Sequence, residues 1–153
     1  MKKYYFTLLL AVLISSCATY KSKYIEDAST VDSATTKSIA HTVYLIGDAG
    51  LSPDNELNPP LKLFKNALNK ANENSIAIFL GDNIYPAGLP DKKDSTLAYR
   101  KAKNHLDAQL KTLENFDGRP LFIPGNHDWY NEGLKGLGRQ EKYVKKKLKQ
   151  KDS

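Results

Sequence analysis

The sequence contains very little cysteine and only one long hydrophobic stretch. A single cysteine among 153 residues excludes a disulfide within the chain and a zinc site built from several cysteines. The hydrophobic run covers the eleven residues 4–14, too few to cross a bilayer core of about 30 Å as a helix. The sequence therefore excludes a protein with several membrane spans, and any metal needs oxygen, imidazole or phenolate ligands.

The formal net charge of +6 is concentrated near the two ends of the chain. Residues 139–153 hold seven basic and two acidic side chains, and Lys2 and Lys3 lie at the start. Residues 17–138 hold 14 basic and 15 acidic side chains, so most of the chain has almost no net charge. Because nucleic-acid binding needs a basic surface, we expect no nucleic-acid partner.

The first residues have the layout of an export signal, with two lysines, a hydrophobic run and small residues before Cys17. Ile-Ser-Ser-Cys at residues 14–17 resembles the lipobox of bacterial lipoproteins, in which the cysteine is acylated. We expect a lipoprotein signal peptide over residues 1–16 and a lipid anchor on Cys17. Several acyl chains there would hold the protein stably at a membrane of the bacterial cell envelope, on the outer membrane or the periplasmic face. An ordinary, unmodified cysteine is the alternative.

Residues 17–40 are rich in Ser, Thr, Lys and acidic side chains, and we expect them to form a flexible tether. A domain over residues 41–153 follows. Apolar runs at residues 42–46, 76–80 and 121–123 predict parallel strands buried on both faces. Helical spacing of apolar residues after Pro59-Pro60, and over about residues 95–115, predicts a helix in each gap. The order β-α-β-α-β predicts an α/β fold whose binding groups gather at the carboxyl ends of the strands.

A polar turn with glycine follows each predicted strand. The turns are Gly-Asp-Ala-Gly at residues 47–50, Gly-Asp-Asn-Ile-Tyr at residues 81–85 and Gly-Asn-His-Asp at residues 125–128. Glycine allows a sharp turn, and parallel strands end at one edge, so the carboxylate and amide oxygens should converge. Each turn alone is typical of an ordinary loop, but the three in this order predict a site for a hard cation.

Together these turns resemble the first three signature blocks of the calcineurin-like metallophosphoesterases, over about residues 41–130. Most of that superfamily begins with Asp-x-His, whereas this chain has Gly50 at the histidine position. Gly-Asp-x-Gly followed by Gly-Asp-x-x-Tyr is similar to the purple acid phosphatases. The resemblance implies the N-terminal half of a metallophosphoesterase α/β sandwich. The implied activity is dinuclear-metal-dependent hydrolysis of a phosphate monoester or diester.

The resemblance also implies metal ligands. Asp48 is implied to bind the first metal, Asp82 to bridge both metals and Asn126 to bind the second. Tyr85 is implied to bind the first metal as a phenolate, in place of the histidine missing at position 50. A phenolate favours ferric iron, so the implied cofactor is Fe(III) with divalent Fe, Zn or Mn. For Tyr85 an aromatic lid over the turn is the alternative.

His127 resembles the family's catalytic histidine, which contacts the phosphate and can protonate the leaving alkoxide, and Asp128 can orient its ring. A structural role is the alternative for His127, since a lone histidine is more often structural. His41 and His105 lack such a context, and we expect neither to be catalytic.

The family has two later histidine blocks, whereas this sequence has no histidine after His127. Only a glycine-rich loop at residues 133–138 and a Lys-rich helix are expected there. We therefore expect a fragment of a longer protein or a truncated gene product, with little activity alone and a poorly covered apolar sheet face. The chain also resembles the start of long bacterial lipoproteins that end in an outer-membrane barrel. The alternative function is a non-catalytic lipoprotein scaffold that binds a partner or an anion.

Overall fold

The computed structural model describes residues 38–53, 56–94 and 96–151. All the helices and strands below belong to one unit, Ile39–Ser153. The expected signal peptide, Cys17 and nearly all of the expected tether lie outside the described residues. Within the described part of the chain, no helix is both long enough and apolar enough to cross a bilayer.

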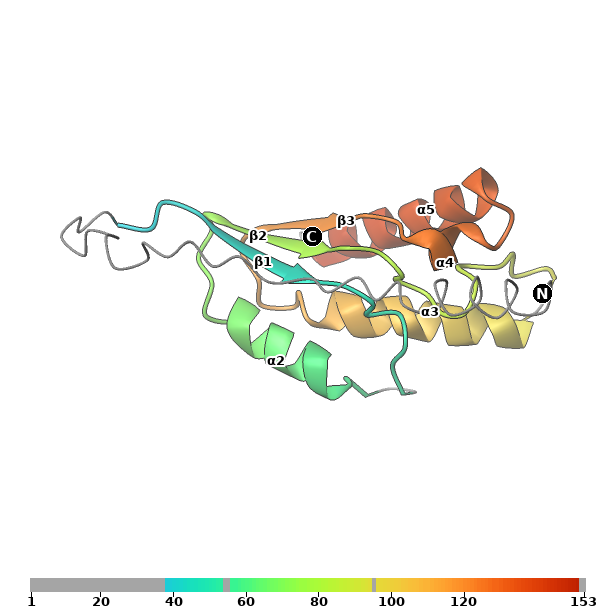
Figure 1. The fold of residues 1–153 in the computed structure, drawn as a ribbon, viewed down its shortest axis with the longest axis horizontal. Coiled ribbons are helices and arrows are strands. Elements are labelled where there is room, and N and C mark those ends of the chain that lie inside the picture. Colours follow the sequence, from blue (N-terminus) through green and yellow to red (C-terminus); the bar gives the residue numbers. More distant parts are fainter. Residues whose placement is uncertain (1–37, 54–55, 95, 152–153) are drawn as a thin grey trace, which may run out of the picture. The chain divides into compact units, whose positions relative to one another are not determined.

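Three parallel strands form a sheet in the order β1-β2-β3 (Figure 1). Their bounds are Thr42–Ile46 for β1, Ser75–Phe79 for β2 and Arg119–Phe122 for β3. Helix α2, Pro59–Leu68, joins the first two strands, and α3, Thr96–Lys111, joins the second and third. The predicted α/β fold with a parallel sheet is therefore confirmed.

Helix α2 begins where the sequence provides a cap. The side chain of Asn58 accepts a hydrogen bond from the backbone N–H of Leu61 at 3.0 Å. Pro59 and Pro60 occupy the first helical positions, where the missing N–H costs no helical hydrogen bond. The cap therefore fixes where the helix begins, and its buried face consists of Leu61, Phe64 and Leu68.

The main core lies between the helices and one face of the sheet. Phe79 of β2 is fully buried, and its ring stacks on Phe122 of β3 with centroids 4.2 Å apart. Phe64 of α2 meets Phe79 edge-on at 5.5 Å. These contacts fix the sheet against the helix layer, because aromatic pairs in such geometries add stability beyond the area they bury.

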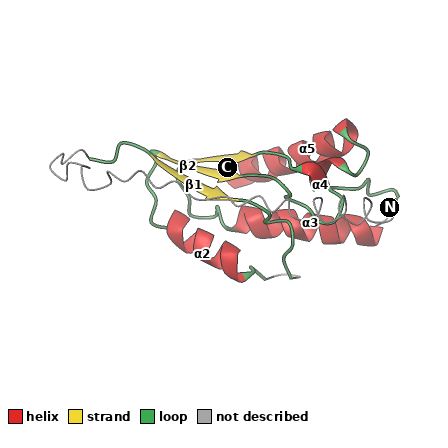
Figure 2. Cartoon of the chain, in the orientation of Figure 1, coloured by secondary structure: helices red, strands yellow, loops and turns green. Residues whose placement is uncertain are grey.

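The other face of the sheet is open at β1 in the part of the chain that the structure describes. In β1, Val43 and Leu45 are 52% and 57% exposed, whereas Tyr44 and Ile46 pack toward the core. The crossover helices α2 and α3 lie on the same side of the sheet (Figure 2), as right-handed crossovers that advance in one direction require. The prediction of burial on both faces is therefore wrong for β1, where the expected poorly covered apolar face is present, whereas every residue of β2 is buried or partly buried.

The segment after β3 is more helical than expected. It forms the short helix α4, Asn126–Trp129, and the long helix α5, Leu134–Lys151, so most of the expected loop at residues 133–138 is helix. Arg139 donates to the carbonyl of Leu89 through Nε and Nη2 at 3.1 and 3.0 Å and pairs with Glu132 at 2.5 Å. Val144 is buried against α3. These tertiary contacts override the weak helix propensity of the glycines.

Candidate metal centre

The three polar turns meet at the carboxyl end of the sheet. The backbone N–H of Asp48 donates to the carbonyl of Gly81 at 3.2 Å, and that of Tyr85 donates to the carbonyl of Gly50 at 3.0 Å. The third turn packs on the second so closely that a Cβ on Gly125 would lie 2.3 Å from the backbone nitrogen of Asp82. The convergence predicted for the turns is therefore present.

Asp48 and Asp82 occupy matching places in the first two turns. Both have a left-handed backbone, with φ of 54° and 50° respectively. Few residues other than glycine adopt this conformation, although aspartate tolerates it. Backbone strain of this kind clusters at functional sites, and here it occurs at two residues that the sequence pattern selects as metal ligands.

Three side-chain oxygens from these two turns come together. The hydroxyl of Tyr85 lies 2.7 Å from Oδ1 of Asp48 and 2.9 Å from Oδ2 of Asp82. A phenol has one hydrogen and can donate it to only one carboxylate at a time. The two carboxylates hold the pKa of Tyr85 far above its usual value, the hydrogen bond to Asp48 being the largest cause.

This donor set fits a hard cation. A divalent or trivalent ion would supply the positive charge that these oxygens lack and would favour the phenolate form of Tyr85. Among the described residues, no group of three or more His, Cys, Asp and Glu side chains is placed to hold a metal ion. The oxygen donors that the described residues bring together at this point are thus two carboxylates and a phenol.

His127 of α4 joins the third turn to the second. Its backbone N–H donates to Oδ1 of Asp82 at 3.0 Å, and its ring lies 4.5 Å from that of Tyr85 and 4.9 Å from that of Tyr130. The ring Nδ1 is 2.6 Å from the carbonyl oxygen of Pro86. Because a carbonyl only accepts, Nδ1 carries a hydrogen, and Nε2 is the nitrogen that can accept or deliver a proton.

The hydrogen-bond partners of Asp128 do not include the expected one, the ring of His127. Its fully buried carboxylate accepts four hydrogen bonds, from the backbone N–H groups of Asn83, Ile84 and Gly125 and from the side chain of Asn83, at 2.8–3.1 Å. None of these bonds goes to the ring of His127, so the expected orientation of that ring by Asp128 is not found. Asp128 instead ties the second turn to the third and acts as a positioning residue.

Asn126 and the two other described histidines each have a hydrogen-bond partner. Asn126 begins α4, and its Nδ2 donates to the hydroxyl of Tyr130 at 2.7 Å. This hydrogen bond uses the amide nitrogen and does not involve the amide oxygen. His41 is exposed, with Nδ1 3.3 Å from the carbonyl of Asn74. His105 accepts a hydrogen bond from the backbone N–H of Ser52 at 3.1 Å.

Two buried amides that the sequence reasoning missed hold the second turn in place. Nδ2 of Asn83 donates to the carbonyl of Ile123 at 2.8 Å. Nε2 of Gln109 on α3 donates to the carbonyl of Asn83 at 2.7 Å. The signal for Gln109 was its place three residues after Leu106, on the apolar face of the helix.

The comparisons with known proteins agree with this geometry. The family model for calcineurin-like phosphoesterases matches residues 41–152. The chain belongs to this family. Comparisons with curated proteins and with solved structures each gave no significant match. The chain thus carries a phosphoesterase hydrolase domain of a kind that generally uses two metal ions, and its three-stranded parallel sheet is consistent with part of the metallophosphoesterase fold.

In this phosphoesterase domain, the backbone of the second turn fills the space beside Gly50. A Cβ on Gly50 would lie 2.4 Å from the carbonyl oxygen of Asp82 and 2.5 Å from the backbone nitrogen of Ile84. Real Cβ atoms do not approach backbone atoms so closely, so no side chain fits at position 50 unless the second turn moves.

Proposed function

We propose that these residues form the first part of a dinuclear metal centre that hydrolyses phosphate esters, similar to that of the purple acid phosphatases. The main support is the approach of the Tyr85 hydroxyl to Asp48 and Asp82, at 2.7 and 2.9 Å. Two bound metal ions would activate water and neutralise charge on the phosphoryl group. The substrate is a phosphate ester.

In this proposal Asp48 and Tyr85 hold the first metal, Asn126 holds the second and Asp82 holds both. The two oxygens of Asp82 already have different neighbours, since Oδ2 faces the hydroxyl of Tyr85 and Oδ1 accepts from the backbone of His127. This arrangement suits a carboxylate shared by two ions. The phenolate favours Fe(III), paired with divalent Fe, Zn or Mn.

His127 is the proposed acid. With Nδ1 engaged by the carbonyl of Pro86, a proton held at Nε2 can pass to the leaving alkoxide. The rings of Tyr85 and Tyr130 beside the imidazole restrict its rotation. Asp128 contributes by fixing the turn that carries both His127 and Asn126.

We further propose that the enzyme is lipid-anchored through Cys17 in the bacterial cell envelope, with residues 17–40 as its tether. The support is the order of positive residues, apolar run and lipobox in the sequence. We also propose that the 153 residues alone bind metal weakly and turn over little substrate. Their ligand set at the centre is two carboxylates, a phenol and an amide, whereas the family pattern adds later histidines.

The ligand assignment is tested by adding Fe(III) to the purified chain and recording the visible absorption spectrum. We expect a phenolate-to-iron charge-transfer band that disappears in Tyr85→Phe and weakens in Asp48→Asn. Tyr143→Phe is the matched control, because its hydroxyl also bonds a carboxylate, that of Asp107, but between α5 and α3. A band that survives in Tyr85→Phe, or that is lost equally in Tyr143→Phe, contradicts the assignment.

Hydrolysis is tested separately with a chromogenic phosphate ester in the presence of Fe and either Zn or Mn. Any metal-dependent turnover should be lost in Asp82→Asn and retained in Asp91→Asn, a carboxylate in an exposed turn. Turnover that Asp82→Asn leaves unchanged argues against the proposed centre. An iron band without turnover, even in a chain extended through the later histidine blocks, would favour the non-catalytic scaffold.

A further inference from the structure

Tyr130 contacts two residues of the proposed metal centre. It follows directly after α4, and its backbone N–H donates to the carbonyl of His127 at 3.3 Å. Its ring centroid lies 4.9 Å from that of His127, and its hydroxyl oxygen accepts a hydrogen bond from Nδ2 of Asn126 at 2.7 Å. This last contact joins Tyr130 to the proposed ligand of the second metal.

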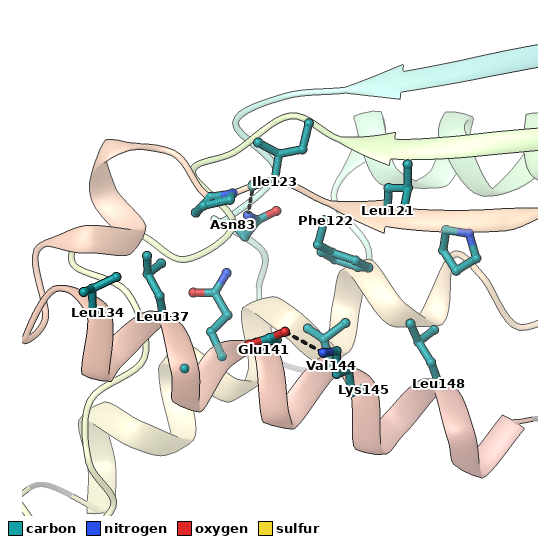
Figure 3. A pocket seen from close by; sticks show the side chains of 14 residues that line it. Asn83, Leu121, Phe122, Ile123, Leu134, Leu137, Glu141, Val144, Lys145 and Leu148 are labelled. Carbon is teal, nitrogen blue, oxygen red and sulfur yellow. Dashed lines mark hydrogen bonds and ion pairs between the residues drawn. The ribbon is translucent and has the colours of Figure 1, made fainter.

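The backbone that carries Asn126 is held independently of its side chain. Nδ2 of Asn83 donates to the carbonyl of Ile123 at 2.8 Å, a contact drawn as a dashed line in Figure 3, which looks into the pocket between β3 and α5. The backbone N–H of Gly125 donates to the buried carboxylate of Asp128 at 2.8 Å. With the backbone fixed in this way, the orientation of the Asn126 amide is decided by its own side-chain contacts.

Only one end of an asparagine amide can bind a cation. Oδ1 has lone pairs, whereas Nδ2 carries two donor hydrogens. The torsion about the Cβ–Cγ bond is broad and roughly two-fold, so an unrestrained amide can present either end. The hydroxyl oxygen of Tyr130 engages Nδ2 of Asn126 and leaves Oδ1 as the end available to a cation.

The same hydrogen bond should strengthen when a cation occupies Oδ1 of Asn126. A cation on the oxygen draws electron density from the amide and makes Nδ2 a better donor, because groups in a hydrogen-bonded chain polarise one another. A bond that is stronger in the metal-bound state raises the affinity for the metal. Partners that orient metal ligands typically contribute roughly 10–100-fold to metal affinity.

We propose that Tyr130 is a positioning residue for the second metal, and that it acts by holding the amide of Asn126 with Oδ1 toward the ion. The inference rests on the proposed function, because it takes Asn126 as a ligand of that metal. The hydroxyl of Tyr85 meets Asp48 and Asp82 directly, so binding of the first metal should not depend on Tyr130.

The hydrogen bond itself is tested by NMR without any metal. In the isotope-labelled 153-residue chain, the side-chain NH₂ signals of Asn126 are assigned by their absence from the spectrum of Asn126→Asp. We expect one of the two proton signals to move upfield in Tyr130→Phe, which removes the hydroxyl and keeps the ring beside His127. Tyr44→Phe is the matched control, because it removes the hydroxyl of a β1 residue that packs on the main core. Signals that do not move in Tyr130→Phe would overturn the proposal.

The effect on metal binding is measured by titrating Mn²⁺ into the chain loaded with Fe(III) and following the free Mn²⁺ by EPR. Tyr130→Phe should raise the dissociation constant of Mn²⁺ about tenfold and leave the wavelength of the Tyr85 iron band unchanged. Tyr44→Phe should leave both unchanged. Because Tyr130 is 61% exposed, loss of its hydroxyl should not alter the urea midpoint, which separates an effect on the metal from an effect on folding.

A double-mutant cycle separates orientation of the amide from a general structural role. Either oxygen of a carboxylate can bind a cation, so Asn126→Asp removes the need to orient this side chain. Tyr130→Phe should therefore cost no Mn²⁺ affinity in the Asn126→Asp chain. A loss of similar size in both backgrounds, or in neither, would overturn the proposal.

These outcomes also separate the role of Tyr130 from the proposed function. An iron band with equal Mn²⁺ affinities in the wild-type and Tyr130→Phe chains refutes the role of Tyr130 and leaves the first metal site intact. A wild-type chain with neither an iron band nor Mn²⁺ binding refutes the proposed centre, and the role of Tyr130 with it.

Discussion

Replacing Asp128 by asparagine should destabilise the domain more than any surface carboxylate-to-amide change. Oδ2 of Asp128 accepts three hydrogen bonds and Oδ1 accepts one, from the backbone of Ile84 at 3.1 Å. An asparagine retains most of these bonds by placing its oxygen at the Oδ2 position, so its NH₂ group then faces the N–H of Ile84. One bond to a charged acceptor is lost, at roughly 1.5–3 kcal/mol, and the other three become neutral and weaker.

The buried carboxylate no longer needs desolvation in the variant, which offsets part of this loss. We therefore expect a net decrease of about 3 kcal/mol in the free energy of unfolding and a fall in Tm of roughly 10 °C. Urea unfolding can be followed through Trp129, the single tryptophan of the sequence, which adjoins Asp128.

The control is Asp91→Asn. Oδ1 of Asp91 accepts one hydrogen bond, from the backbone N–H of Lys93 at 2.9 Å in an exposed turn, and an asparagine can accept the same bond. We expect its stability to stay within about 0.5 kcal/mol of the wild-type chain. If Asp128→Asn is equally neutral at an unchanged m-value, Asp128 does not join the two turns in the way described.

Three further changes test the packing and the titration of the domain. Phe79→Leu should lower the free energy of unfolding in urea by about 2 kcal/mol, because it removes a stacked and an edge-on aromatic contact from the core. An unchanged urea midpoint would contradict this packing of Phe79. Gly50→Ala should cost about 1–3 kcal/mol in thermal unfolding, since its Cβ would lie 2.4 Å from the carbonyl oxygen of Asp82; full stability would show that the second turn yields easily. Burial and the hydrogen bond to Asp107 raise the pKa of Tyr143 well above its usual value. The raised pKa stabilises the fold below pH about 10, and this contribution is lost as the pH rises further. Tyr143→Phe should therefore make the alkaline fall in unfolding free energy shallower, and an identical pH profile would refute this.

Hydrophobic runs predicted the existence, order and direction of the strands, but their ends less well. β1 has the predicted bounds, whereas β2 begins at Ser75 and β3 at Arg119, each before its apolar run. Arg119 enters the sheet because it pairs with Ile76 in the register of β2 and β3. Such pairing is a property of two strands together, and the hydropathy of one segment does not contain it.

The glycine turns predicted which residues converge, but not the partners of each side chain. Asp128 follows His127 directly, so a contact between the two was the natural expectation. The short helix α4 instead directs the side chain of Asp128 into the protein, where it accepts hydrogen bonds from the backbone N–H groups of Asn83 and Ile84 in the second turn. A four-residue helix leaves too short a pattern for periodicity to detect.

The positions of Gly50 and Tyr85 depend on each other. Because position 50 has no side chain, the backbone of the second turn passes directly against it, and the N–H of Tyr85 bonds to the carbonyl of Gly50 at 3.0 Å. This contact holds Tyr85 where its hydroxyl reaches Asp48 at 2.7 Å. A histidine at position 50 would push the second turn away and withdraw the phenol. A side chain at position 50 would therefore displace the turn that carries the phenol, and in the proposed centre Tyr85 takes the place of the histidine as the ligand.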